Sequence, residues 1–269
     1  MDILIAALIF AVLGAVIGAL LAVASKAFEV PVDEKAEKIT AVLPGANCGG
    51  CGYSGCAALA EAISKGKAPC GSCTVGGDEV AEAVAEIMGV KAEKTVRMRA
   101  QVMCSGTLDK AKHKYIYEGI ENCIAAMQLG GGSKVCPNGC LGLGACAQKC
   151  PFGAIEIVDG VAKVDYHKCK GCGVCVATCP KHIIKLVPFD SRVYVGCMSV
   201  DKGAVTRSYC ESGCISCRIC EKNCPTGAIT VKDFVASIDY DKCINCGKCA
   251  EKCPRKVIHF AKLKDNENG

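Results

Sequence analysis

The sequence predicts an α+β chain with an N-terminal transmembrane helix, a small helical domain and two tandem cysteine-rich modules. Three observations lead to this prediction. An uncharged stretch opens the chain, the spacing C-x2-C-x2-C-x3-C-P occurs three times among 25 cysteines, and the second half of the chain repeats itself. The expected segments are an anchor (1–27), a linker (28–40), a four-cysteine domain (41–90), a connecting segment (91–135), module 1 (136–190), a connecting strand segment (191–209), module 2 (210–262) and a tail (263–269).

The first segment, from Ile3 to Ser25, carries no charged residue. A helix of this length extends about 34 Å, which is enough to cross the core of a bilayer. Only Asp2 precedes it, whereas basic residues follow it: Lys26, Lys35 and Lys38. The positive-inside rule therefore predicts a single-pass protein of the cell membrane with most of the chain in the cytoplasm. Ala22-Val23-Ala24 leaves a cleaved signal peptide as the alternative.

The helical domain is predicted around the spacing C-x2-C-x4-C, formed by Cys48, Cys51 and Cys56 among several glycines. Glycine allows backbone amides to turn toward cluster sulfurs. Short helices are expected at 57–65 and 78–88, the second with an apolar face. We assign Cys73 as the fourth ligand of a [4Fe-4S] cluster because it stands beside Gly76-Gly77. Cys70 is the alternative ligand, and zinc is the alternative metal.

The three complete runs have the spacing of bacterial ferredoxins, in which three thiolates hold one [4Fe-4S] cluster and the cysteine before proline reaches the neighbouring cluster. They comprise Cys169, Cys172, Cys175 and Cys179; Cys214, Cys217, Cys220 and Cys224; and Cys243, Cys246, Cys249 and Cys253. Disulfide scaffolds are usually shorter, and structural zinc sites usually pair two C-x2-C units across a spacer. The spacing therefore favours iron–sulfur clusters and one-electron chemistry.

An internal repeat organises the remainder of the chain. The segment 136–140 matches 210–214, and 150–155 matches 224–229. Strand-like hairpins follow in both copies, at 155–158 with 161–164 and at 229–231 with 235–238. A cysteine-bearing strand precedes each copy, with Cys104 before the first and Cys197 before the second. The sequence thus predicts two ferredoxin-like modules, each holding two clusters.

Ligand sets follow from the spacing for three of the module sites. They are Cys214, Cys217, Cys220 and Cys253; Cys224, Cys243, Cys246 and Cys249; and Cys150, Cys169, Cys172 and Cys175. The fourth site is unusual because Leu143 stands where the repeat has Cys217. It retains Cys140, Cys146 and Cys179, and Cys136 is the nearest substitute. A three-ligand [3Fe-4S] cluster is the alternative at this site.

Five such sites use twenty of the 25 cysteines. We expect a sixth cluster between the modules, bound by Cys104, Cys123, Cys197 and Cys210. The alternative is that these cysteines are small buried hydrophobic residues.

Charge and composition argue against other functions. The formal net charge of +5 counts no thiolates, and six four-thiolate clusters would add about −12. A holoprotein that is acidic and lacks tryptophan is not expected to bind nucleic acid. The dinucleotide loop G-x-G-x-x-G and the phosphate loop G-x-x-x-x-G-K-[ST] are both missing from the sequence. We therefore predict no catalytic residues and no substrate-converting site.

Taken together, the uncharged first segment, the Cys48-Gly-Gly-Cys51-Gly-Tyr-Ser-Gly-Cys56…Cys73 site and the tandem modules resemble the B subunit of the Rnf complex, in the long form found in anaerobes. Val75 departs from the proline usual in that family. The resemblance implies an electron-transfer subunit of an ion-translocating ferredoxin:NAD+ oxidoreductase. It also implies reduced ferredoxin and the other Rnf subunits, some of them flavin-bearing, as partners.

Two other classes of protein remain open from the sequence. One is an electron-transfer subunit of another membrane-anchored reductase or dehydrogenase. The other is an interaction module stabilised by zinc.

Overall fold

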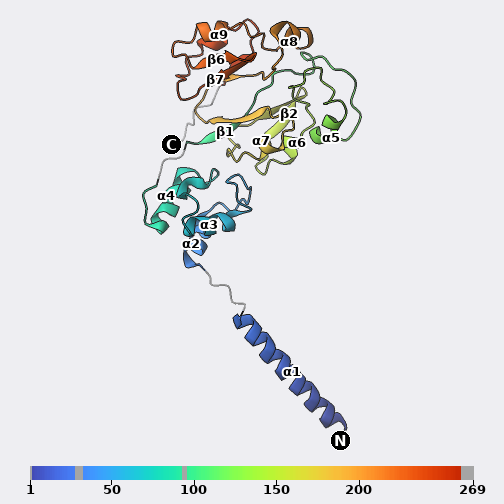
Figure 1. Cartoon of the computed structure of the whole chain (residues 1–269), viewed down its shortest axis with the longest axis vertical. Helices are drawn as coiled ribbons and strands as arrows, with labels where there is room; N and C mark the ends of the chain where they lie inside the picture. The colour runs from blue at the N-terminus through green and yellow to red at the C-terminus, as the bar shows by residue number, and fades with distance from the viewer. Residues whose placement is uncertain (1, 28–32, 93–95, 262–269) are drawn as a thin grey trace.

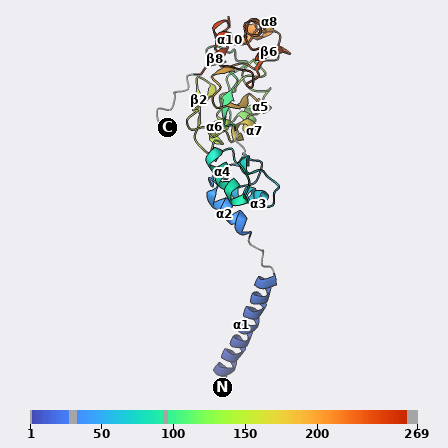
Figure 2. The ribbon, with the colours of Figure 1, turned by 90° about the vertical axis from the view of Figure 1, so that its left-hand side faces the viewer.

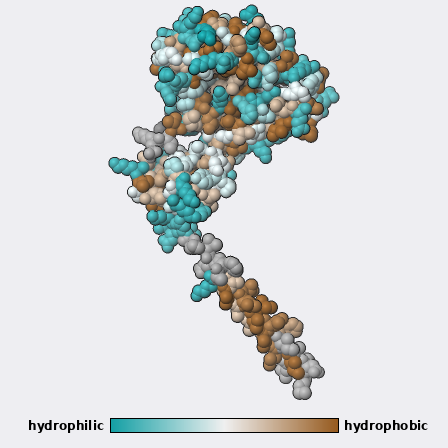
Figure 3. All heavy atoms as spheres, in the orientation of Figure 1, coloured by the Kyte–Doolittle hydropathy of each residue, from teal (hydrophilic) through white to brown (hydrophobic). Residues whose placement is uncertain are grey.

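The computed structural model describes residues 2–27, 33–92 and 96–261. Helix α1 (Asp2–Ala27) covers the predicted anchor and lies apart from the other elements in Figure 1. Its described side chains are largely apolar and exposed, as the brown helix in Figure 3 shows. Among the described residues, no helix meets the combined length and apolarity required to cross a membrane.

The helical domain consists of α2 (Glu34–Val42), α3 (Cys56–Ser64), the 3-10 turn η1 (Cys70–Ser72) and α4 (Gly77–Met88). In both views these helices lie between α1 and the rest of the chain (Figures 1 and 2). Ile39, Leu59, Ile63 and Val84 form the centre of their core, and each is at most 1% exposed. Burial of these aliphatic side chains holds the three helices together.

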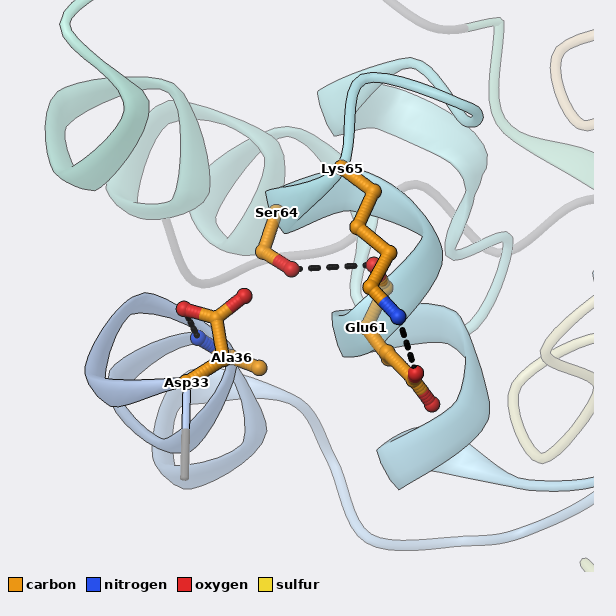
Figure 4. A network of polar contacts seen from close by, with 5 residues as sticks. All are labelled: Asp33, Ala36, Glu61, Ser64 and Lys65. Atoms are coloured by element: carbon orange, nitrogen blue, oxygen red, sulfur yellow. Dashed lines mark hydrogen bonds and ion pairs between the residues drawn. The ribbon is translucent and has the colours of Figure 1, made fainter. Parts of the chain in front are cut away.

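Polar contacts define where two of these helices begin and end (Figure 4). The Asp33 carboxylate accepts hydrogen bonds from the backbone amides of Lys35 (3.0 Å) and Ala36 (3.3 Å), which caps α2. In the last turn of α3 the Lys65 ammonium pairs with the Glu61 carboxylate, and the Ser64 hydroxyl donates to the Glu61 carbonyl (2.9 Å). Helix α2 therefore occupies most of the predicted linker, of which residues 28–32 lie outside the described residues.

Each repeat is built around two antiparallel two-stranded sheets. In the first repeat β1 (Met98–Val102) pairs with β4 (Ile184–Pro188), and β2 (Ile155–Val158) pairs with β3 (Val161–Val164). In the second repeat β5 (Val193–Val195) pairs with β8 (Ile258–Phe260), and β6 (Ile229–Lys232) pairs with β7 (Val235–Ile238). The helices are short: α5 (Cys123–Gln128), α6 (Ala145–Gln148), α7 (Val174–Thr178), α8 (Gly203–Tyr209), α9 (Ile219–Lys222) and α10 (Lys248–Glu251).

The sheet pairings move the module boundaries that the spacing suggests. Strand β1 belongs to the predicted connecting segment, yet it pairs along its full length with β4 of module 1, from Met98 opposite Pro188 to Val102 opposite Ile184. In the same way β5 pairs with β8 of module 2. Each strand therefore closes the module that follows it. The predicted tail, 263–269, lies outside the described residues.

Candidate cluster-binding sites

Four loops of the two repeats share one backbone conformation. In each loop the residue directly before the second ligand position and the residue directly after it have positive φ. These pairs are Gly142 and Gly144, Gly171 and Gly173, Ser216 and Arg218, and Asn245 and Gly247. This left-handed geometry is costly for residues other than glycine, yet Ser216 (φ 55°) and Arg218 (φ 59°) adopt it. The winding turns successive backbone amides toward the space between the cysteines, where they can donate to cluster sulfurs.

The helical domain holds the first candidate site. Cys48, Cys51, Cys56 and Cys73 line one cavity of about 320 Å³, and Cys70 is not among its lining residues. Burial raises the pKa of the Cys73 thiol, while the backbone amides of Gly76 and Val75 lower it. The Asn47 side chain accepts a hydrogen bond from the Cys56 amide (2.8 Å) and so fixes the start of α3. The structure therefore places Cys73, the preferred fourth ligand, with the other three.

In the second repeat the structure brings together both predicted cysteine sets. Cys224, Cys243, Cys246 and Cys249 line a cavity of about 330 Å³. The members of the other set lie close together: burial and the nearby thiols of Cys214, Cys217 and Cys253 together raise the pKa of Cys220 to about 11. Cys217 and Cys246 are exposed, so both sites reach the protein surface.

In the first repeat Cys150, Cys169, Cys172 and Cys175 also come together. Burial, together with the thiols of Cys169, Cys172 and Cys150, raises the pKa of the Cys175 thiol to about 12. Backbone amides donate to two of these sulfurs, from Ala100 to Cys169 (3.3 Å) and from Ala154 to Cys150 (3.4 Å). The second repeat has the equivalent of the latter bond, from Ala228 to Cys224 (3.2 Å).

The two remaining quartets differ from the predicted ones because Cys123 and Cys136 have exchanged places. The cavity at the Leu143 loop is lined by Cys123, Cys140, Cys146 and Cys179. A second cavity, of about 370 Å³, lies between the repeats and is lined by Cys104, Cys136, Cys197 and Cys210. The cavities thus place Cys123 with the first set and Cys136 with the second, the reverse of the predicted grouping, because α5 carries Cys123 to the loop whose second ligand position is Leu143.

The four cysteines between the repeats occupy matching positions in the two copies. Cys104 matches Cys197, and Cys136 matches Cys210, so each repeat supplies the same two positions. Their hydrogen bonds also match: the Cys140 amide donates to the Cys104 sulfur (3.4 Å), and the Cys214 amide donates to the Cys197 sulfur. The repeat alignment alone could therefore have identified this set. We call it the bridging quartet.

Neighbouring thiols link five of the six sets in series, and the sixth, which contains Cys249, shares a hydrophobic core with Cys214, Cys220 and Cys253 of the fifth. Burial raises the pKa of the Cys172 and Cys146 thiols. Cys48 of the helical domain lies close enough to raise the pKa of Cys172 as well, and Cys175 raises that of Cys146. Cys140 neighbours Cys104 of the bridging quartet, and Cys197 of the same quartet neighbours Cys214. A Cβ atom on Gly50 would lie only 2.2 Å from the Cys172 carbonyl oxygen, so the helical domain packs directly on module 1.

The donor set fits iron–sulfur clusters. Each set offers four thiols, all of them buried or half-buried except Cys217 and Cys246, and backbone amides donate to several of the sulfurs. Within the described ranges, no three His, Cys, Asp or Glu side chains stand close enough together to hold one metal ion. A cluster places irons and sulfides between its thiolates, so its ligands are spaced more widely than those of a single ion.

Comparison with known proteins agrees with this interpretation. Residues 43–75 match a family described as a putative Fe-S cluster. Residues 130–181, 168–228 and 213–258 each match families described as 4Fe-4S dicluster domains. The fold and the sites therefore define an iron–sulfur protein of the polyferredoxin class.

Three curated relatives align with most of the chain. The B subunit of the ion-translocating oxidoreductase complex of Methanosarcina acetivorans is 44% identical over 87% of this chain and 89% of its own length. The B subunit of the Na(+)-translocating ferredoxin:NAD(+) oxidoreductase complex of Acetobacterium woodii is 48% identical over 87% of this chain and 71% of its own length. The proton-translocating counterpart from Clostridium ljungdahlii is 39% identical, over 86% and 82% respectively. The chain belongs to the family of B subunits of ion-translocating oxidoreductase (Rnf) complexes.

Proposed function

We propose that this chain is the electron-relay subunit of an ion-translocating ferredoxin:NAD+ oxidoreductase. It receives electrons from reduced ferredoxin and passes them to the membrane subunits of the complex. The observation that carries this proposal is the series of six cysteine quartets, each adjacent to the next. The names of the relatives support the reaction and the assembly.

The proposal assigns one [4Fe-4S] cluster to each quartet, including four thiolates at the Leu143 loop in place of a [3Fe-4S] cluster. When bound, such clusters accept and release single electrons at potentials set by hydrogen bonds, burial and nearby charge. The proposed ligands, in spatial order, are Cys48, Cys51, Cys56 and Cys73; Cys150, Cys169, Cys172 and Cys175; Cys123, Cys140, Cys146 and Cys179; Cys104, Cys136, Cys197 and Cys210; Cys214, Cys217, Cys220 and Cys253; and Cys224, Cys243, Cys246 and Cys249.

We place the ferredoxin-facing end at module 2 and the delivering end at the helical domain. Exposed Cys217 and Cys246 support the first assignment, because a donor must approach a cluster closely. The second is supported by α1, which precedes the helical domain in the chain. Ile3 to Ser25 is uncharged, and we propose that it anchors the chain in the membrane as a single span with the modules in the cytoplasm.

A variant at the helical domain tests this order. We expect Cys48→Ser to abolish NADH formation by the assembled complex. Reduced ferredoxin should still reduce the other clusters, because module 2, where electrons are proposed to enter, is unchanged. Absorbance bleaching under anaerobic conditions follows the reduction. Cys70→Ser is the matched control, since Cys70 lies in the same domain but does not line the cavity, and it should retain activity. A Cys48→Ser chain that ferredoxin cannot reduce would reverse the proposed order.

A further inference from the structure

A buried lysine forms part of the wall of the bridging cavity. Lys134 is 2% exposed, and its ammonium donates hydrogen bonds to the carbonyls of Gly106 (2.6 Å) and Gly160 (3.1 Å). Those carbonyls are neutral, and no ion pair found among the described residues includes Lys134. Lysine is rarely buried without an anionic partner, because removing an ammonium from water is costly. We therefore expect a negative charge close to the Lys134 ammonium.

The bridging quartet supplies that charge. Lys134 lies two residues before Cys136, and it lines the same cavity as all four cysteines. Its ammonium binds the carbonyl of Gly106, and a Cβ atom on Gly106 would lie 3.4 Å from the Cys210 sulfur and 3.7 Å from the Cys104 sulfur. Burial raises the pKa of the Cys210 and Cys140 thiols, and the positive charge of Lys134 lowers it. The ammonium therefore faces the thiols of two consecutive sites.

Other charges around the cavity reinforce this field. Arg255 donates to the carbonyls of Cys210 (2.9 Å) and Gly213 (3.4 Å), and Lys181, at the equivalent position of the first repeat, donates to the Pro137 carbonyl (2.6 Å). Among the described residues no Asp or Glu lines the cavity, and the Tyr209 hydroxyl on its wall donates a hydrogen bond to the Asp201 carboxylate (2.7 Å). Of these cations Lys134 is the most deeply buried, so solvent screens it least.

We propose that Lys134 sets the reduction potential of the bridging cluster and holds it above that of the clusters on either side. The proposal rests on the function proposed above. Reduction adds one negative charge to the cluster, and a fixed cation in a medium of low dielectric stabilises the reduced form. An electron that leaves module 2 is then drawn to the boundary between the repeats, through which every electron must pass.

The test is a redox titration of the full chain, prepared anaerobically and followed by electron paramagnetic resonance. Lys134→Gln keeps a hydrogen-bond donor but removes the charge. We expect it to lower the equilibrium constant for one-electron reduction of one cluster at least tenfold, which is about 59 mV for a one-electron couple. The adjacent Cys140 cluster should shift less, and the other four should not shift.

Two variants serve as controls and one identifies the cluster. Lys134→Arg keeps the charge and should retain the potential of the wild type. Lys112→Met removes an exposed lysine whose backbone amide bonds Tyr209, and it should shift no potential. Cys197→Ser identifies the bridging cluster, because its signal should disappear from that spectrum.

The outcomes separate this inference from the function on which it rests. If Cys197→Ser removes no signal, there is no bridging cluster and the six-site relay fails. If the signal is present but keeps its potential in Lys134→Gln with full iron content, the role of Lys134 is overturned. Lys134→Met provides a second neutral side chain if the glutamine variant does not assemble, and it should show the same fall in potential.

Discussion

Leu143 occupies the position at which the other three loops carry their second cysteine, yet its loop keeps their backbone. Gly142 (φ 73°) and Gly144 (φ 74°) reproduce the two left-handed residues of the complete runs. A side chain at Gly142 would collide with the backbone of Gly160, since a Cβ atom would lie 2.5 Å from its carbonyl oxygen. The loop thus retains the backbone conformation of a cluster-binding loop, and the proposed fourth thiol is that of Cys123, which lines the same cavity.

Cys123 is positioned by the helix that it begins. The Asn122 side chain caps α5 by accepting hydrogen bonds from the amides of Ile124 (2.8 Å) and Ala125 (3.4 Å). Cys123 is buried with Ala126 against Leu141 and Ala145. Asn122 and this packing fix the thiol at the wall of the cavity that Cys179 also lines.

A pair of alanine variants distinguishes the two quartets that the exchange concerns. Cys123→Ala leaves three thiols at the Leu143 loop, so we expect its cluster to lose one iron and to give a [3Fe-4S] signal. Cys136→Ala should instead diminish the signal that Cys197→Ser removes. Iron analysis and electron paramagnetic resonance of anaerobic protein measure both effects. Cys70→Ala is the control with unchanged iron content, and a three-iron signal from Cys136→Ala would place Cys136 at the Leu143 loop after all.

At the scale of elements, the modules have little regular structure to support themselves. Helices α6, α9 and α10 have 4 residues each, and the strands pair only two by two. Isolated hairpins and single helical turns are marginal in water. Buried cysteines contribute to both module cores, so the clusters would replace much of a conventional hydrophobic core.

Removal of iron tests this dependence. We expect a chelator with a reductant to unfold both modules, because metal binding there is folding energy. The helical domain should keep more of its structure, since α2, α3 and α4 bury Ile39, Leu59 and Val84 in a core whose fully buried members include no cysteine. Hydrogen exchange measured by mass spectrometry reports each segment separately. Residues 97–261 should lose protection and 34–88 should retain part of it; equal protection in both before and after chelation would contradict the prediction.

At the scale of the whole molecule, the two repeats are joined by a site to which both contribute equally. The bridging quartet closes a path that would otherwise break between Cys140 and Cys214. The helical domain extends the path at one end, where Gly50 packs on Cys172. Electron transfer along the chain is therefore a property of the assembled fold and not of either module.

The proposed anchor is also tested on the whole molecule. Deletion of residues 2–27 should release the chain from washed membranes when it is expressed without its partner subunits, because no other segment of such length is both uncharged and almost entirely apolar. The iron content should stay unchanged, since α1 carries no cysteine. Cell fractionation with iron analysis measures both. A truncated chain that remains in the membrane fraction would refute the single-span anchor.

Much of this architecture follows from local patterns. The hairpins at 155–164 and 229–238 and the helices at 57–65 and 78–88 form where the sequence predicts them, within one residue at most ends. Their signals are alternation, turn residues and apolar spacing, all of which act over a few positions. The same locality explains why the linker gives no helical signal, because α2 is stabilised by Ile39 in a core assembled from distant helices.

The sequence by itself predicted iron–sulfur chemistry for the cysteines, the two repeats and three of the four module quartets, because ligands on one tight loop follow from spacing alone. Only the tertiary structure decided that Cys123 joins the Leu143 loop and that Cys136 faces Cys210 across the repeats. Those partners are far apart in the chain, and no local spacing specifies them. Their meeting depends on how β1, β5 and α5 pack around the boundary between the repeats.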